Sequence, residues 1–406
     1  MSPRLRGALS NLALAAASLG LTLLAAELAL RLLAGPARGG KEQLERARYT
    51  EHDPVLGWRK KPGASVRFER RDFSSEFALN SRGLRGPDRP YERGEGVARV
   101  LALGDSFVEA FMVEDALTPT ARLEARLAER GCRTEAINGG TVGYGTDQEY
   151  LFFRDEGRRY RADVVVLYVY HNDIPYLVLD SNLGFPKPVL SFEATPPVVT
   201  NLPVPEYVPQ PPPATPAPMP PPPSSYLVAL VQDRLERSAP RTYDRLAGLG
   251  LWEPLRKLEL NEELQLFRVP ELGHLRPAWS AFTWTLQSLE REVAESGGRL
   301  LVAYVPSRME VQDGVWELTQ VRYGLDPQAY DRRAVASRVR FIAGRLRLPF
   351  VDFTQPLARA EGALSPTYFA TDSHWNARGM DVAAQALAQE LLVRKLLPGC
   401  DQEKLR

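Results

Sequence analysis

The sequence predicts an α/β domain built on a doubly wound, mainly parallel five-stranded sheet, interrupted by a proline-rich and helical insertion. Two patterns support this fold class. Short, continuously apolar runs, typical of strands that are buried on both faces, alternate with segments whose apolar residues recur at helical spacing. The 406 residues are 44% hydrophobic and 25% charged, which is typical of a globular protein with a substantial core.

Five apolar runs are the candidate strands, and in chain order they read RVLALGDSF, TEAIN, DVVVLYVY, RLLVAYVP and PFVDF. Helices are expected between and after them, at about 118–131, 147–159, 278–295, 327–344 and 377–393. The first of these begins at Thr118-Pro119, where an N-cap residue precedes a proline at the first helical position. In such a sheet the functional site lies at the carboxyl ends of the strands.

The N-terminus differs from the rest of the chain. Residues from Ala8 to Ala26 are almost wholly apolar, which is about the length of one bilayer-spanning helix. Arg4 and Arg6 precede this run, so the positive-inside rule places the start of the chain in the cytoplasm and everything after about residue 34 outside. We expect residues 1–34 to be an uncleaved, single-pass anchor in the inner (cytoplasmic) membrane, with a periplasmic catalytic domain. A cleaved signal peptide is the alternative.

The remaining chain divides by composition. Residues 35–96 are polar and rich in Gly, Pro and Arg, and are expected to form a lead-in segment with one or two short strands. The main domain is expected in two parts, 97–180 and 276–406. Between them, 181–275 is interpreted as a proline-rich linker and helical insertion. Its first part, 181–225, contains PQPPPATPAPMPPPP and is expected to be an extended, polyproline-like spacer.

Composition also argues against several functions. Lys and Arg total 51 against 50 Asp and Glu, so no excess positive charge favours nucleic-acid binding. The two cysteines, Cys132 and Cys400, form either one disulfide or two free thiols, and lack the spacing of a zinc site. No cluster of metal-ligand residues and no phosphate-binding loop of the Walker kind occurs, so no metal and no cofactor is expected.

Polar residues that could carry chemistry follow the candidate strands. Ser106 comes directly after the first strand, in Gly104-Asp105-Ser106, where a serine can project at the sheet edge or simply cap the next helix. The glycine-rich loop 138–145 follows the second strand, and its glycines allow backbone N–H groups to approach a bound oxygen closely. A flexible turn is the simpler interpretation of that loop.

Further candidates follow the third and fifth strands. His171-Asn172-Asp173 ends the third strand, and an Asn amide there can donate a hydrogen bond to a developing oxyanion or merely favour the turn. Asp372 and His374 follow the fifth strand and bring a carboxylate and an imidazole together. Among the four histidines, His171 is the rival to His374 as a general base, and spacing alone does not exclude it.

These four blocks together resemble the SGNH or GDSL superfamily of hydrolases, in which Ser, Gly, Asn and His come in this chain order. The resemblance covers about residues 52–393, including DPVLGW and the NSRGLR segment, which resembles membrane-anchored bacterial members. It implies a flavodoxin-like SGNH fold. It also implies that Ser106 is the nucleophile and that His374, rather than His171, is its base, oriented by Asp372.

By the same resemblance, the oxyanion hole consists of the Ser106 amide, Gly143 and Asn172. Gly143 is preferred to Gly140, because the family pattern has a loop glycine about five residues after the Asn that ends the second strand. One feature departs from the pattern, since many members place the acid three residues before the histidine, where this chain has Thr371. The Asp-x-His-Trp form is instead similar to periplasmic polysaccharide O-acetyltransferases such as the alginate acetylation proteins, although there the motif precedes the serine.

The resemblance implies a serine-dependent acyl-ester hydrolase, an esterase acting on O-acetylated carbohydrate. The alternative is an O-acetyltransferase for cell-envelope or extracellular polysaccharide, which would take its acyl group from a membrane protein. A lipase or phospholipase is a third reading. A membrane-anchored protein with the same fold that binds polysaccharide without turnover is a fourth, and the presence of all the catalytic residue types counts against it.

Overall fold

The computed structural model describes residues 3–33, 42–191, 194, 198–207, 225–255, 258–362 and 364–400. The run PQPPPATPAPMPPPP, expected to be polyproline-like, lies outside the described residues. The chain forms two compact units. The smaller takes its described residues from Met1–Gly39, Gln210–Leu258 and Glu317–Gly324, and the larger from Gly40–Pro209, Glu259–Trp316 and Leu325–Arg406.

The larger unit is built on a five-stranded parallel sheet with the strand order β13-β12-β7-β5-β6. Its strands are β5 (Ala98–Leu103), β6 (Thr134–Asn138), β7 (Val164–Val169), β12 (Arg299–Tyr304) and β13 (Phe350–Asp352). Every residue of β5 and β7 is buried, as expected for mainly apolar strands covered on both faces, and Arg99 is the one charged residue in them. The five expected strands and the doubly wound fold class are therefore confirmed.

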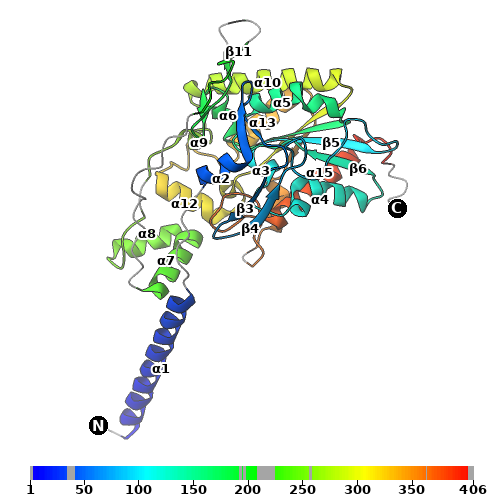
Figure 1. Cartoon of the computed structure of the whole chain (residues 1–406). Coiled ribbons are helices and arrows are strands. Elements are labelled where there is room, and N and C mark those ends of the chain that lie inside the picture. The colour runs from blue at the N-terminus through cyan, green and yellow to red at the C-terminus, as the bar shows by residue number, and fades with distance from the viewer. Residues whose placement is uncertain are drawn as a thin grey trace. The chain divides into compact units, whose positions relative to one another are not determined.

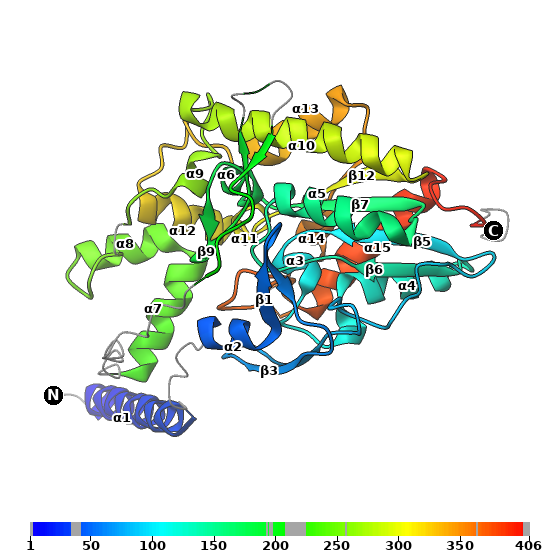
Figure 2. The same cartoon turned by 45° about the horizontal axis from the view of Figure 1, so that its top comes forward.

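Helices cover both faces of this sheet (Figure 2). On one side, α4 (Pro119–Ala128) packs against α15 (Ala377–Val393), which also contacts α14 (Thr354–Ala360). On the other, α10 (Arg276–Glu295) packs against α5 (Thr146–Asp155) and β12, and α13 (Ala334–Arg345) packs against β13. One expected helix starts later than predicted, at Ala334 rather than about 327, because a turn with isolated bridge pairing at Tyr330 precedes it.

Short elements surround the sheet. The lead-in carries α2 (Glu42–Tyr49) and two antiparallel pairs, β1 (Thr50–Asp53) with β2 (Gly57–Lys60), and β3 (Ser65–Glu69) with β4 (Ser74–Ala78). The short helical segments of the larger unit are α3 (Ser106–Glu109), η1 (Asp115–Leu117), η2 (Gly157–Tyr160), α6 (Asp173–Tyr176), α9 (Glu262–Gln265), η3 (Gly273–Leu275) and α11 (Arg308–Val311). The helix α12 (Asp313–Tyr323) follows α11 and was not expected from the sequence.

Residues 181–200 differ from the expected spacer. They form β8 (Ser181–Asn182) paired with β9 (Phe185–Pro186), and β10 (Val189–Ser191) paired with β11 (Val198–Thr200). Lys187 between these pairs is fully buried and its ammonium lies 2.5 Å from the Asp147 carboxylate. Strands of two or three residues are too short to show a periodic pattern in the sequence. The prediction of a spacer is wrong here because tertiary contacts, and not local preference, stabilise these strands.

The smaller unit contains α1 (Pro3–Leu33), α7 (Tyr226–Ser238) and α8 (Pro240–Gly248). Within α1, Leu14–Leu32 is long and apolar enough to cross a membrane by length and composition. The helical content expected after residue 225 is present, since α7 and α8 account for most of 226–248.

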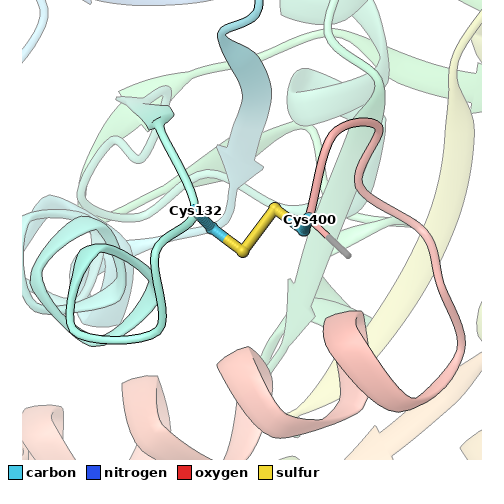
Figure 3. The surroundings of a disulfide bond; sticks show 2 residues. All are labelled: Cys132 and Cys400. Atoms are coloured by element: carbon cyan, nitrogen blue, oxygen red, sulfur yellow. A yellow bond between two sulfur atoms is a disulfide. The ribbon is translucent and has the colours of Figure 1, made fainter. Parts of the chain in front are cut away.

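A disulfide joins Cys132, just after α4, to Cys400, beyond α15 (Figure 3). The two Cα atoms lie 5.1 Å apart although the residues are 268 positions apart in sequence. The bond therefore links the C-terminal ends of α4 and α15, which pack against each other. The sequence left open whether the two cysteines form a disulfide or stay as free thiols, and in the structure they form the disulfide.

We expect replacement of Cys400 by Ala to lower the free energy of unfolding by about 2–4 kcal/mol, because the cross-link restricts the unfolded chain. Denaturant unfolding of the full chain in detergent measures this loss. The double variant Cys132→Ala/Cys400→Ala serves as the control and should lose no more than the single variant. An unchanged midpoint in both would show that the bond does not contribute to stability.

Candidate active site

Ser106 is the first residue of α3, directly after β5. The Asp105 side chain caps this short helix by accepting a hydrogen bond from the Phe107 backbone N–H at 2.9 Å. Only 8% of Ser106 is exposed, and it lines a cavity of about 470 Å³ at the carboxyl end of the sheet. The sharp strand-to-helix connection thus presents Ser106 to the cavity, as expected for the end of a parallel strand.

Ser106, His374 and Asp372 form one continuous hydrogen-bonded chain. Ser106 Oγ lies 2.7 Å from His374 Nε2, and His374 Nδ1 lies 2.5 Å from Asp372 Oδ1. The same carboxylate oxygen accepts the backbone N–H of His374 at 2.8 Å. A carboxylate can only accept here, so Nδ1 carries the proton and Nε2 is left to accept from the serine hydroxyl.

The loop that carries Asp372 is held from outside the cavity. Asp72, in the turn between β3 and β4, accepts hydrogen bonds from the Thr371 hydroxyl at 2.7 Å and the Asp372 backbone N–H at 3.1 Å. Arg308 donates to the Ala370 carbonyl at 2.8 Å. Thr371, which stands where many SGNH members have their acid, therefore faces Asp72. The acid in this chain is Asp372, two residues before His374, and the Asp372 carboxylate contacts the imidazole.

Electrostatics at this pair favour an ionised Asp372. Partial burial works to raise its pKa, but hydrogen bonds from the His374 ring and backbone outweigh burial, so the pKa of Asp372 lies below its ordinary value. The His374 ring packs between Phe107 and Phe111, with ring centroids 4.8 and 5.9 Å away. An anionic Asp372 beside a partly dehydrated imidazole can stabilise the imidazolium ion that forms when the serine loses its proton.

Gly143 and Asn172 also line the cavity, whereas Gly140 does not. Gly143 has φ of +74°, and its N–H has no hydrogen-bond partner among the described residues. The Gly140 N–H, by contrast, donates to the Asn138 side chain at 3.1 Å. The Asn172 carboxamide is likewise without a partner in the described part of the chain, and its oxygen is buried. The donors named from the sequence thus remain available to a bound oxygen.

The loop 140–143 is fixed by side chains that the sequence did not single out. Lys60 donates to the Gly140 carbonyl, and Arg46 donates to the Val142 carbonyl at 3.0 Å. Asn182 Nδ2 donates to the Gly143 carbonyl at 2.7 Å. These donors come from the lead-in segment and from the β8–β9 pair. The loop carbonyls are thus satisfied, and the Gly143 N–H stays without a partner among the described residues.

Glu109 completes this clamp from the same short helix that carries Ser106. Its side chain is fully buried, and Oε2 accepts the Val142 backbone N–H at 2.7 Å. Burial raises the pKa of Glu109, while the charges of Lys60, Arg46 and Arg85 oppose that rise. Burial also lowers the pKa of Lys60 to about 8. A small buried charge cluster therefore ties the nucleophile helix to the glycine loop.

Four buried carboxyl groups interact electrostatically near the cavity. Asp105 lines it, whereas Asp147, Glu149 and Asp173 do not. Burial raises the pKa of each above its ordinary value, and repulsion between Asp105, Glu149 and Asp173 adds to the effect for Glu149 and Asp173. Asp147, the fourth, is paired with Lys187. Burial thus disfavours negative charge most strongly on Glu149 and Asp173, whose pKa values lie well above the ordinary ones.

His171, the rival base, does not contact Ser106. It is buried with 5% exposure, and its Nε2 lies 3.4 Å from Glu263 Oε2 of α9. Glu263 lines the cavity, and its hydrogen bond with His171 is the largest cause of the lowered pKa of its carboxyl group. His171 therefore positions the cavity wall, and His374 is the histidine within reach of the serine.

Several cavity-lining residues were missed by sequence reasoning. They lie in α2, in the β8–β9 pair and in α9, where the sequence shows no catalytic motif and no strong periodicity. These residues are Arg46, Tyr49, Asn182, Leu183, Phe185 and Glu263. Within the described residues, no group of His, Cys, Asp or Glu has an arrangement that could hold a metal ion.

Residues 272–406 match the family model of the SGNH hydrolase-like domain, acetyltransferase AlgX. The match includes Asp372 and His374 but not Ser106, Gly143 or Asn172, so the geometry alone links those residues to the matched part. The search of curated proteins gave no match.

Solved structures similar to the chain include TesA, with 12% identity and a TM-score of 0.37, covering 74% of this chain and 99% of the other. LAE5, an α/β hydrolase enzyme from the metagenome of Lake Arreo in Spain, has 14% identity and a TM-score of 0.38, covering 74% and 96%. A mutant of Axe2, an acetyl-xylooligosaccharide esterase from Geobacillus Stearmophilus, has 14% identity and a TM-score of 0.37, covering 72% and 94%. These values are too low to bear on activity.

We expect Glu109→Gln to lower kcat on the order of tenfold to a hundredfold with little change in KM, because loss of the charge loosens the loop that presents Gly143. Steady-state kinetics on an acetyl ester measures this split. The matched control is Glu124→Gln, since Glu124 also accepts a backbone N–H, that of Ala136 at 2.6 Å, but lies on α4 away from the cavity. Equal loss of kcat in both variants would indicate a general loss of stability instead.

Proposed function

We propose that the protein is a serine-dependent acyl-ester hydrolase that removes acetyl groups from O-acetylated carbohydrate. The match of residues 272–406 to the SGNH hydrolase-like domain, acetyltransferase AlgX, supports this class of activity. The observation that carries the proposal is the hydrogen-bonded chain from Ser106 through His374 to Asp372. The family match supports an acetyl group as the acyl part, and the carbohydrate is part of the proposal.

In the first half of the reaction, Ser106 Oγ attacks the ester carbonyl carbon while His374 Nε2 takes the hydroxyl proton. Asp372 stabilises the imidazolium ion through Nδ1. The carbonyl oxygen becomes an oxyanion, which accepts hydrogen bonds from the N–H groups of Ser106 and Gly143 and from the Asn172 carboxamide. The tetrahedral intermediate then collapses. The C–O bond to the sugar breaks, and His374 returns the proton to the leaving alkoxide.

In the second half, the acyl-Ser106 ester is attacked by an incoming hydroxyl whose proton passes to His374 Nε2. The bond between the acyl carbon and Ser106 Oγ then breaks, and His374 returns the proton to Oγ. When that hydroxyl belongs to water, the products are acetate and the free serine. When it belongs to a sugar, the acetyl group is transferred. The residues perform the same steps in both cases, so the choice depends on which acceptor occupies the cavity beside the acyl-enzyme.

O-acetyl transfer to a cell-envelope or extracellular polysaccharide is the second candidate function. The specific observation that favours it is the family model itself, which is described as an acetyltransferase and matches the segment with Asp372 and His374. In that case an acyl-donor protein in the membrane would supply the acetyl group.

We further propose that α1 anchors the chain in the inner membrane with the larger unit in the periplasm. The 19-residue span Leu14–Leu32 is of sufficient length and composition, and Arg4 and Arg6 precede it. The Cys132–Cys400 disulfide supports the same side for the larger unit, because such bonds persist in the oxidising periplasm and are rare in the cytosol.

The full chain in detergent should turn over an acetylated chromogenic ester, and Ser106→Ala should abolish both turnover and labelling by a serine-directed phosphonate. Measurement of acetate and of acetylated oligosaccharide, with and without an oligosaccharide acceptor, separates the two candidates. Acetate alone identifies the hydrolase. Acetylated oligosaccharide formed at the expense of acetate identifies the transferase.

The matched control is Ser280→Ala, which removes an exposed serine on α10 and should leave turnover and labelling unchanged. Circular dichroism of both variants checks that folding is intact. Undiminished turnover of Ser106→Ala would remove the central claim, and complete absence of turnover and labelling in the unmodified chain would indicate a binding protein.

Asp372→Asn and Asn172→Ala should act differently although both change polar residues of one site. Asp372→Asn should lower kcat by a factor of up to about 10⁴ and slow phosphonate labelling, because His374 loses its orienting acceptor. Asn172→Ala should cost roughly 3 kcal/mol of transition-state stabilisation, about a hundredfold in kcat, with KM nearly unchanged. Steady-state kinetics and labelling rates distinguish the two.

A change of less than about threefold in Asn172→Ala would fall well below the loss typical of an oxyanion donor. Asn172 would then only end β7, and the oxyanion hole would consist of the Gly143 and Ser106 amides.

A further inference from the structure

Glu27, near the end of the apolar span of α1, makes an unusual set of contacts within the smaller unit. Its carboxylate accepts hydrogen bonds from the Ser225 hydroxyl at 2.9 Å, from the Tyr226 backbone N–H at 3.0 Å and from the Leu227 backbone N–H at 2.8 Å. The Ser225 hydroxyl in turn accepts the Val228 N–H at 3.2 Å. All three N–H groups of the first turn of α7 are therefore satisfied without water.

These contacts fix the depth at which α7 begins. Glu27 lies five residues before Leu32, the end of the span, and an α-helix rises 1.5 Å per residue. The first turn of α7 is thus held about 8 Å below the end of the span, measured along α1. If α1 crosses the membrane as proposed above, α7 starts inside the bilayer and not above it.

The sequence of α7 fits such a start. Its first six residues, Tyr226 to Val231, are apolar on every side of the helix, and none of them is buried by protein. The exposed fractions of Val228, Leu230 and Val231 are 47%, 51% and 46%. A helix that is apolar all round is normally surrounded by an apolar medium.

The charged residues of α7 come only after this stretch, from Asp233 onward. Six helical residues rise at most about 9 Å, which matches the depth of about 8 Å set by Glu27. Along α7, the apolar residues thus give way to charged ones at about the height where the apolar span of α1 ends.

We propose that α7 is a second membrane-contacting element, whose first two turns insert into the outer leaflet beside α1 and emerge from the bilayer near Gln232. The proposal rests on α1 being a membrane span. Glu27 is then a carboxylate retained within the span because it satisfies backbone donors that lipid cannot satisfy. Arg31, one turn nearer the surface, pairs with Glu27 at 2.7 Å and lies over the Tyr226 ring, a combination typical of the interface.

We prefer the bilayer to a protein partner because the apolar stretch at the start of α7 lies beside the apolar span of α1. Glu27 holds the two at the same depth. A single span allows the chain to tilt and rotate about α1. A second inserted helix, docked by hydrogen bonds to the first, would restrict that rotation and set which side of the smaller unit faces the membrane.

Spin labelling of the full chain in nanodiscs of phosphatidylethanolamine and phosphatidylglycerol tests this contact. Nitroxide labels are placed singly at Leu230→Cys, Arg234→Cys, Leu19→Cys and Phe341→Cys, and the native cysteines are bonded to each other. Relaxation by oxygen reports lipid, and relaxation by a water-soluble nickel chelate reports water. Phe341 is the matched control, since it is an apolar side chain on α13 with 56% exposure, similar to that of Leu230.

We expect the labels at Leu230 and Leu19 to collide more with oxygen than with nickel, and those at Arg234 and Phe341 to show the reverse. A label at Leu230 that behaves like that at Phe341, while Leu19 stays in lipid, would overturn the inference and leave the anchor intact. Nickel access at Leu19 would overturn both. Protection of Leu230 from both reagents, with dipolar broadening between labels, would instead identify a second copy of the chain as the partner.

The role of Glu27 is tested in the same labelled protein. Glu27→Ala should increase nickel collisions at Leu230 and leave Leu19 unchanged, because α7 loses its attachment to α1. Glu236→Ala, which removes a carboxylate of α7 that pairs with Arg322 instead, is the control and should leave Leu230 in lipid. An unchanged depth at Leu230 in Glu27→Ala would contradict the docking that the inference requires.

Discussion

The hydrogen bond between Ser106 and His374 joins residues 268 positions apart, and the larger unit is organised so that they meet. The parallel sheet brings the carboxyl ends of β5, β6 and β7 to one edge, where Ser106, Gly143 and Asn172 line a single cavity. The loop with His374 comes from the far end of the chain. It is held by Asp72 from the lead-in and by Arg308 from α11, so the site depends on contacts from three distant parts of the sequence.

Buried charge is used around this site in two ways. Cations and Glu109 surround the loop 140–143, and they satisfy its carbonyls and the Val142 N–H. Burial and repulsion between carboxyl groups raise the pKa values of Glu149 and Asp173 well above the ordinary ones, whereas Asp147 pairs with Lys187. In the proposed reaction, N–H donors around the cavity would stabilise the oxyanion, and burial would disfavour negative charge on Glu149 and Asp173.

Carboxylates that accept backbone N–H groups recur through the chain. Glu124 does so at β6, Glu109 at the glycine loop, Asp372 at the loop with the histidine, and Glu27 at the start of α7. In the cavity these hydrogen bonds set the geometry on which acyl transfer would depend, and in the smaller unit they fix the start of α7 to α1.

The sequence by itself predicted the parallel sheet, because mainly apolar runs such as β5 and β7 alternate along the chain with helical patterns. It also made Ser106, Asp372 and His374 candidates for catalysis, through the resemblance of their blocks to the SGNH superfamily. Only the tertiary structure decided that the Gly140 N–H is occupied, that the Gly143 N–H has no partner among the described residues, and that side chains such as Asn182 hold the loop between them. Asn182, Leu183 and Phe185, in a segment expected to be a spacer, instead line the cavity. Local preference in these segments is weak, and their conformations follow from buried hydrogen bonds to residues far away in the chain, which no periodicity in the sequence reveals.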